Sequence, residues 1–245
     1  MWAGDPLLLS WWLGGFDLFN SYRTVSVTAL GGDSSDLFEI VALINMVSNI
    51  PLFPLSHGVF PDGMLVLQIF EVRYLDLIKR SHQQQLPFGV VWLKKGREVQ
   101  VPSETPLLHA FGCLAHIKEF EQLQANLFRV ICQGGARFTL HDTQPGPFGV
   151  WQGEVTYLPD DPEVQIPESL QQHADRLGKV IATAQQQGQS QRLPIFAPFC
   201  LDQCGWVANR YAEAMSISSA EKMNLLCELD PLQRMQKVDL LLRDA

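Results

Sequence analysis

Short apolar runs of strand length dominate the chain between residues 46 and 158. Each run is bounded by Gly, Pro, Asp or Asn, residues that favour turns over strand interiors. The pattern predicts strands over residues 64–70, 88–93, 112–117, 127–132 and 150–158. One helix is predicted at 71–80, where Tyr74, Leu77 and Ile78 recur at the i, i+3, i+4 spacing. Strands this short and this regularly spaced favour a closed or nearly closed small barrel.

Two glycine-containing segments are predicted to be turns between these strands. Residues 94–97, Lys-Lys-Gly-Arg, are typical of a hairpin tip because glycine readily adopts positive φ. Residues 133–135, Gln-Gly-Gly, are predicted to separate the strand 127–132 from a further strand at 137–140. Both segments are interpreted as hairpin-like breaks.

After residue 158 the hydrophobic period changes from that of strands to that of helices. The junction at 158–162, Leu-Pro-Asp-Asp-Pro, is rich in turn formers, and its two aspartates are interpreted as a solvated turn rather than a cation site. Beyond it, apolar residues recur every three or four positions over 170–184 and 201–215. Ser218 and Glu221 have capping-box spacing, and Asp230 precedes a proline at the start of a last helix. A four-helix lobe is therefore predicted.

Residues 1–45 share neither pattern. Their apolar stretch contains Asp5 and Asp17 and has no basic residue ahead of it, so it matches a signal peptide or a membrane span poorly. Met46 directly precedes the first well-patterned segment. We therefore expect translation to start at or near Met46, with residues 1–45 as an extension outside the fold. A barrel lobe at 46–158 and a helical lobe at 159–245 would follow.

The composition is that of an acidic globular protein, with 47% hydrophobic residues, 18% charged residues and a formal net charge of −8. This charge disfavours binding along nucleic-acid phosphates, and basic residues gather only in small clusters at 73–80 and 94–97. The five cysteines, an odd number without zinc-finger spacing, favour a reducing cytoplasm over a disulfide framework.

No arrangement of residues that would carry catalysis is found along the chain. It contains no Gly-x-Ser-x-Gly, His-Glu-x-x-His, Gly-x-Gly-x-x-Gly or Walker A motif, and its six histidines are scattered singly. A length of 245 residues is also too short for an AAA+ ATPase module together with a protease domain. The sequence thus predicts no catalytic, cofactor-binding or metal-ligating residue, and a protein that is not an enzyme.

A series of short motifs runs through the strand-rich part of the chain. The first are Ile-Pro-Leu-Phe-Pro-Leu at 50–55, Val-Phe-Pro-Asp-Gly at 59–63 and Leu-Gln-Ile-Phe-Glu-Val-Arg-Tyr at 67–74. Phe-Gly-Val-Val at 88–91, Gly-Cys-Leu-Ala-His-Ile at 112–117 and Gly-Ala-Arg-Phe at 135–138 follow. In sequence and in order, these motifs resemble the Lon protease N-terminal (substrate-binding) domain family. Val66 and Val72 stand where the family has proline, and the Cys and His ligands of the cereblon-type zinc module are absent.

The resemblance implies an α+β fold, a PUA-like β pseudo-barrel lobe followed by a C-terminal helical bundle. It implies a non-catalytic, cytoplasmic module, without a cofactor, that recognises unfolded or exposed polypeptide segments. Such a module would act as an adaptor or chaperone-like binder in protein quality control, with a separate ATPase or protease as its partner. Binding to a membrane is not expected. Two alternatives stay open: an RNA-binding PUA-like module, and a small-molecule-binding protein or enzyme.

The motif residues of this resemblance are interpreted as mainly structural, with Glu71 and Arg73, and likewise Arg137, forming clamps between barrel and helix. They are Pro54, Pro61, Gly63, Phe70, Glu71, Arg73, Tyr74, Gly112, Arg137 and Phe138. Aromatic side chains that could contact a bound polypeptide, although core packing is the commoner role of such residues, are Trp92, Phe111, Phe120, Phe148, Trp151 and Trp206.

Overall fold

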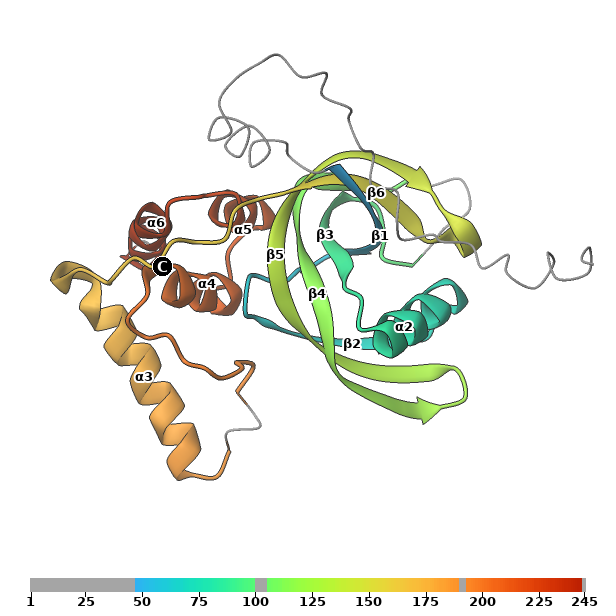
Figure 1. Ribbon diagram of the computed structural model, residues 1–245. Coiled ribbons are helices and arrows are strands. Elements are labelled where there is room, and N and C mark those ends of the chain that lie inside the picture. The colour runs from blue at the N-terminus through green and yellow to red at the C-terminus, as the bar shows by residue number, and fades with distance from the viewer. Residues whose placement is uncertain (1–46, 100–104, 190–192, 244–245) are drawn as a thin grey trace, which may run out of the picture.

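A computed structural model describes residues 47–99, 105–189 and 193–243, which form a strand-built lobe followed by a helical lobe (Figure 1). The predicted extension at 1–45 and the predicted start at Met46 lie outside the described residues. Each helix within these ranges is too short or too polar to cross a membrane.

A mixed six-stranded sheet closes into a barrel, which confirms the predicted α+β class. The strand order is β2-β5-β4-β3-β1-β6. An additional pairing of β6 with β5 closes a ring of β5, β4, β3, β1 and β6, and β2 pairs with β5 outside this ring. All neighbouring strands pair antiparallel except β1 with β3, which pair parallel. The strands are β1 (Val47–Leu55), β2 (Met64–Ile69), β3 (Phe88–Lys95), β4 (Leu107–Gln124), β5 (Leu127–Pro145) and β6 (Trp151–Tyr157).

Strand β5 is continuous, so the predicted break at 133–135 is wrong. Its first half pairs with β2 and its second half with β6. Gly134 lies between the two halves, where an added Cβ would sit 2.0 Å from the carbonyl oxygen of Phe60. Gly134 also donates a hydrogen bond to the carbonyl oxygen of Gly63 at 2.9 Å. The glycine therefore marks a close approach of two backbones inside a strand, not a turn.

Helix α2 (Val72–Gln84) packs beside the β4–β5 hairpin (Figure 1). Its predicted apolar face is confirmed, because Tyr74, Leu77 and Ile78 are each no more than 2% exposed. The ring of Tyr74 stacks on that of Phe53 from β1, with centroids 3.9 Å apart. This face completes the barrel core.

The helical lobe contains the predicted helices with their predicted N-terminal signals. Ser218 Oγ accepts a hydrogen bond from the Glu221 amide, and the Glu221 carboxylate accepts one from the Ser218 amide at 2.8 Å. The Asp230 carboxylate accepts from the amide of Leu232 at 2.9 Å. The helices are α3 (Gln171–Gln186), α4 (Cys204–Ala214), α5 (Ser219–Leu226) and α6 (Pro231–Arg243), with short 3₁₀ turns η1 (Pro147–Gly149) and η2 (Glu168–Leu170).

The barrel contributes side chains to the core of the helical lobe. Phe60 and Trp92, each 1% exposed, pack in one cluster with buried residues of α3, α4, α5 and α6. Their rings meet edge to face, with centroids 6.0 Å apart. The core of the helical lobe is therefore shared with the barrel through these two rings, while the barrel also has a core cluster of its own.

A buried ionic network holds the lobes together beside this core. Arg137 on β5 forms an ion pair with Asp161 at 2.7 Å and donates to the carbonyl oxygen of Glu228 at 2.8 Å. Arg234 on α6 binds both oxygens of the same Asp161 carboxylate. Arg137 is 3% exposed and Arg234 is fully buried. The solvated-turn interpretation is therefore wrong for Asp161, which sits between two buried guanidinium groups, whereas Asp160 is exposed.

Candidate functional site

A cavity of about 500 Å³ lies between the two lobes. Its walls come from β2 and the loop before it, from Trp92 of β3, from α3, α4 and Lys222 of α5, and from residues 193–195 between α3 and α4. The volume is in the range of ligand pockets, about 300–1,000 Å³. Apolar side chains of its wall include Leu65, Val66, Leu177, Val180, Leu193 and Ile195.

Strand β2 borders this cavity with an open edge. Among the described residues β2 pairs as a strand only with β5, which leaves its other edge free of a strand partner. At the start of that edge, Gly63 forms an isolated antiparallel bridge with Ile195. Val66, further along β2, is 46% exposed. The edge therefore already accepts one extended segment and has backbone groups left beyond it.

An ion pair from α4 lies at the inner side of the cavity. Arg210 contacts Glu213 at 3.1 Å and donates to the carbonyl oxygen of Pro61 at 2.6 Å. The Glu213 carboxylate accepts a hydrogen bond from the amide of Phe60 at 3.0 Å. Its Oε1 lies 1.7 Å from where a Cβ on Gly63 would be, so any side chain at position 63 would displace this carboxylate. The pair ties α4 to the loop that precedes β2.

Arg210 also has hydrogen-bonding capacity that the protein does not use. The residue is 3% exposed, and neither its Nε nor its Nη1 has a hydrogen-bond partner among the described residues. Its guanidinium carbon lies 5.6 Å from the ring centroid of Trp206. Buried donors of this kind are rare because leaving one unpaired costs about 1–3 kcal/mol.

Positive charge exceeds negative charge around the cavity. Arg176, Arg210 and Lys222 line it together with a single carboxylate, that of Glu213. Neither Arg176 nor Lys222 forms an ion pair with a described residue, and Lys222 donates to the carbonyl oxygen of Glu213 at 3.2 Å. The cavity is thus cationic in a chain whose net charge is −8.

Burial raises the pKa of Glu213 to about 7, although the charges of Arg210 and Lys222 act in the opposite direction and Asp62 adds to the rise. The folded protein therefore holds more protons at this group than the unfolded chain between the ordinary pKa of 4.5 and about 7. Stability is expected to fall as the pH rises through this window.

Glu213→Gln is expected to flatten that dependence, because the amide does not titrate. Denaturant unfolding of both proteins at pH 4.5, 5.5, 6.5 and 7.5 measures it. Glu119→Gln, which alters an exposed carboxylate on β4, is the control and should keep the slope of the parent protein. An unchanged slope in Glu213→Gln would refute the assignment.

The motif residues at the barrel–helix boundary form a local clamp. Arg73 Nε contacts the Glu71 carboxylate at 3.0 Å, and Nη2 donates to the carbonyl oxygen of Glu98 at the same distance. Its guanidinium carbon lies 4.3 Å from the ring centroid of Tyr74. Arg73 is 9% exposed, so it adds little to the basic cluster at 73–80. Phe70, in contrast, is 59% exposed.

The other motif residues lie in the barrel or in the walls just described. Pro54 is a buried residue of β1, and Pro61 and Gly63 hold the Arg210–Glu213 pair. A Cβ on Gly112 would lie 2.4 Å from the ring of Phe138, which is fully buried. All of these contacts are made within the protein, as the structural interpretation of the motif predicts.

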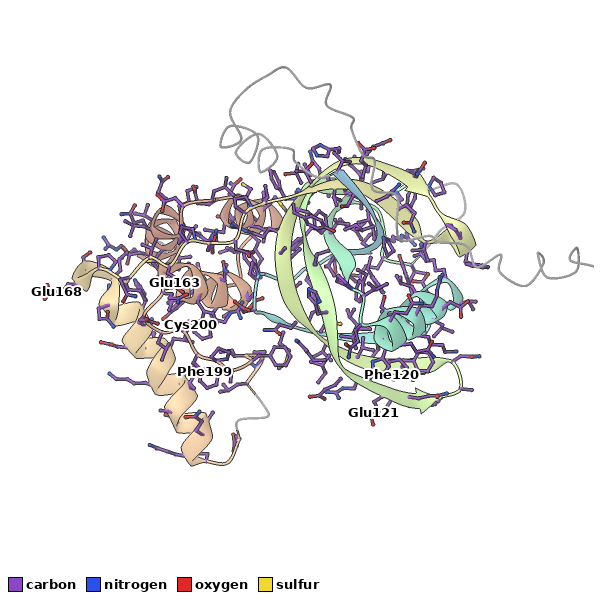
Figure 2. The ribbon with its side chains drawn as sticks, in the orientation of Figure 1. Phe120, Glu121, Glu163, Glu168, Phe199 and Cys200 are labelled. Atoms are coloured by element: carbon purple, nitrogen blue, oxygen red, sulfur yellow. The ribbon has the colours of Figure 1, made fainter. Side chains whose placement is uncertain are left out.

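The six candidate aromatic side chains do not form one surface. Trp92 lines the cavity, Trp206 is 5% exposed beside it, and Phe111 is partly buried against the helical core. Phe120 lies beside α2, far from the helical lobe in Figure 2, and stacks on His82 with centroids 4.7 Å apart. Trp151 is partly buried in the barrel and Phe148 is 72% exposed on η1.

The residues that define the cavity were missed by sequence reasoning. Val66, Val180, Arg176, Arg210 and Lys222 lie on β2, α3, α4 and α5 and belong to no common motif. Val66 and Val180 carried a weak signal, since each is an apolar residue on the polar side of its element. No local pattern in the sequence indicates that the three basic residues lie near one another in the fold.

The fold and the cavity define a class: a closed barrel joined to a helical bundle, with a cavity where they meet. Within the described ranges, no group of three or more His, Cys, Asp or Glu side chains is placed to hold a metal ion. The chain belongs to the family of the ATP-dependent protease La (LON) substrate-binding domain, whose family model matches residues 49–244. The resemblance predicted from the motifs is thus confirmed.

Individual relatives agree with this assignment. The chain is 27% identical to Lon protease 4 of Sorangium cellulosum (strain So ce56) over 207 residues, which cover 81% of the chain and 24% of that protein. It therefore matches about a quarter of the relative's length. The crystal structure of a Lon N-terminal domain protein from Xanthomonas campestris superposes with a TM-score of 0.61 at 25% identity, covering 80% of this chain and 98% of that one.

A more distant structure supports the fold alone. The N-terminal domain of the Mycobacterium avium complex Lon protease has a TM-score of 0.51 at 14% identity, covering 80% of this chain and 99% of that domain.

Proposed function

We propose that this chain is a non-catalytic polypeptide-recognition module that binds unfolded or exposed apolar segments in the cavity between its lobes. The observation that carries the proposal is the apolar cavity beside the open edge of β2. Membership of a substrate-binding domain family supports it, since Lon is a protease and its substrates are polypeptides.

The mode of binding follows from the bridge between Gly63 and Ile195. An extended polypeptide would pair with the remaining backbone groups of the β2 edge, as in other cases of strand addition. Side chains alternate between the two faces of a strand, so every second side chain of the bound segment would enter the cavity. Main-chain pairing of this kind selects for extended, apolar chain rather than for one sequence.

We further propose that the module acts as an adaptor for a separate ATPase or protease in a reducing cytoplasm. The family is that of the substrate-binding domain of an ATP-dependent protease, and the chain covers 24% of the length of Lon protease 4. All five cysteines, including the buried Cys113 and Cys132, are free thiols, which supports a reducing compartment.

Val180→Glu tests the cavity as the binding site. Val180 lines the cavity and is 51% exposed, so the folded protein is expected to tolerate the new carboxylate. Binding of a fluorescently labelled, permanently unfolded polypeptide, such as reduced and carboxymethylated lactalbumin, is expected to weaken at least about tenfold, because an apolar segment would have to desolvate the charge. Fluorescence anisotropy measures the dissociation constant.

The matched control is Leu240→Glu, which places the same charge on an apolar residue of α6 that is 58% exposed and outside the cavity. It should bind the probe as the parent protein does. Equal weakening in both variants would argue against the cavity, and no binding by the parent protein would refute the function.

A further inference from the structure

The charges of the cavity point to a more specific ligand than an apolar segment. Arg176, Arg210 and Lys222 face one carboxylate, so the cavity carries an excess of positive charge that no described residue neutralises. Apolar ligands alone gain nothing from unpaired cations. A group that gains from them is an anion placed at the end of an apolar body.

Arg210 gives this argument an independent second observation. Its side chain lines the cavity, is 1% exposed, and keeps two donors without an acceptor among the described residues. Because Nη2 is already bonded to Pro61 and Glu213 and the other two donors are buried, Arg210 contributes positive charge to the cavity rather than a direct contact with a ligand. Arg176 and Lys222, which are more exposed, are placed to meet the anion at the cavity rim.

The size of the cavity limits what can carry that anion. A volume of about 500 Å³ holds a few residues rather than a long stretch of chain. The apolar walls formed by Val66, Leu177, Val180 and Ile195 require that those residues be apolar. A polypeptide that ends inside the cavity supplies one carboxylate at its terminus without needing an acidic side chain.

We propose that the cavity recognises the free C-terminal carboxylate of an apolar polypeptide end. The inference rests on the proposed function and names its preferred substrate: chains whose last residues are apolar and whose terminus is ionised. Arg176 and Lys222 bind the carboxylate, Arg210 adds its charge from beneath, and the β2 edge pairs with the residues that precede the terminus.

Three labelled peptides test the proposal by fluorescence anisotropy. The first ends in four apolar residues with a free carboxylate, the second is the same peptide with a C-terminal amide, and the third continues past the apolar residues into a Gly-Ser tail. The free acid is expected to bind at least about tenfold more tightly than the amide or the extended peptide. Arg176→Gln and Lys222→Gln should each shrink this ratio.

Lys179→Gln is the matched control, because Lys179 lies on the same helix as Arg176 but outside this cavity. It should keep the ratio of the parent protein. Equal binding of acid and amide would overturn the inference and leave the proposed function standing. The inference would also be overturned if decanoate displaced a bound fluorescent probe and none of the peptides did. If neither the peptides nor the unfolded polypeptide bound, both proposals would be refuted.

Discussion

Asp161→Ala is expected to lower the free energy of unfolding by about 3–5 kcal/mol, the usual cost of removing one partner from a buried ion pair. The substitution leaves Arg137 and Arg234, which are 3% and 0% exposed, with no carboxylate between them. Arg137 keeps its bond to the Glu228 carbonyl oxygen, but a carbonyl does not neutralise its charge. Urea denaturation followed by tryptophan fluorescence measures the loss.

The neighbouring aspartate provides the control for that experiment. Asp160 is exposed, so Asp160→Ala is expected to change stability by no more than about 0.5 kcal/mol. Similar losses in the two variants would show that Asp161 does not hold the lobes together. Asp161→Asn adds a graded comparison, since it keeps the shape of the side chain, removes its charge and replaces one acceptor oxygen with an NH2 donor that faces the arginines.

Trp92→Ala is expected to cost about 3–5 kcal/mol, as large-to-small changes of buried aromatic residues do. Trp92 starts on a barrel strand, packs edge to face on Phe60 and is a member of the helical-lobe cluster. Its removal would open a void on both sides of the lobe boundary. Thermal unfolding followed by circular dichroism checks the loss.

Trp92→Phe should be milder than the alanine variant, because most of the ring volume is kept. Phe148→Ala is the contrasting control: Phe148 is 72% exposed, and its loss should leave stability within about 0.5 kcal/mol of the parent protein. If the Trp92→Ala protein were as stable as the parent protein, Trp92 would not contribute to the shared core, and a role in binding would be favoured instead.

The elements that local sequence signals specify were predictable. The apolar faces of α2 and α4, and the capping box at Ser218 and Glu221, depend on residues within three or four positions of one another. The same holds for most strands, whose apolar alternation is local. The regular spacing of these short strands already predicted a small closed barrel, and the family motifs predicted the same fold.

The failures arose where distant segments meet. Gly134 has the composition of a turn, yet it is inside β5 because the backbone of Phe60, about seventy residues earlier, lies against it. Asp161 has the composition of a solvated turn, yet two arginines from 24 and 73 positions away bury it. The cavity was unpredictable for the same reason, since its cations come from α3, α4 and α5.

The shared core has a consequence for dividing the chain. A fragment that ended at the 158–162 junction would expose Phe60 and Trp92, which pack in the helical cluster, and would leave Arg137 without Asp161. The complementary fragment would lack those two aromatic rings and would expose the apolar side chains that pack with them. The two halves are therefore expected to melt in a single cooperative transition, and neither should be soluble when expressed by itself.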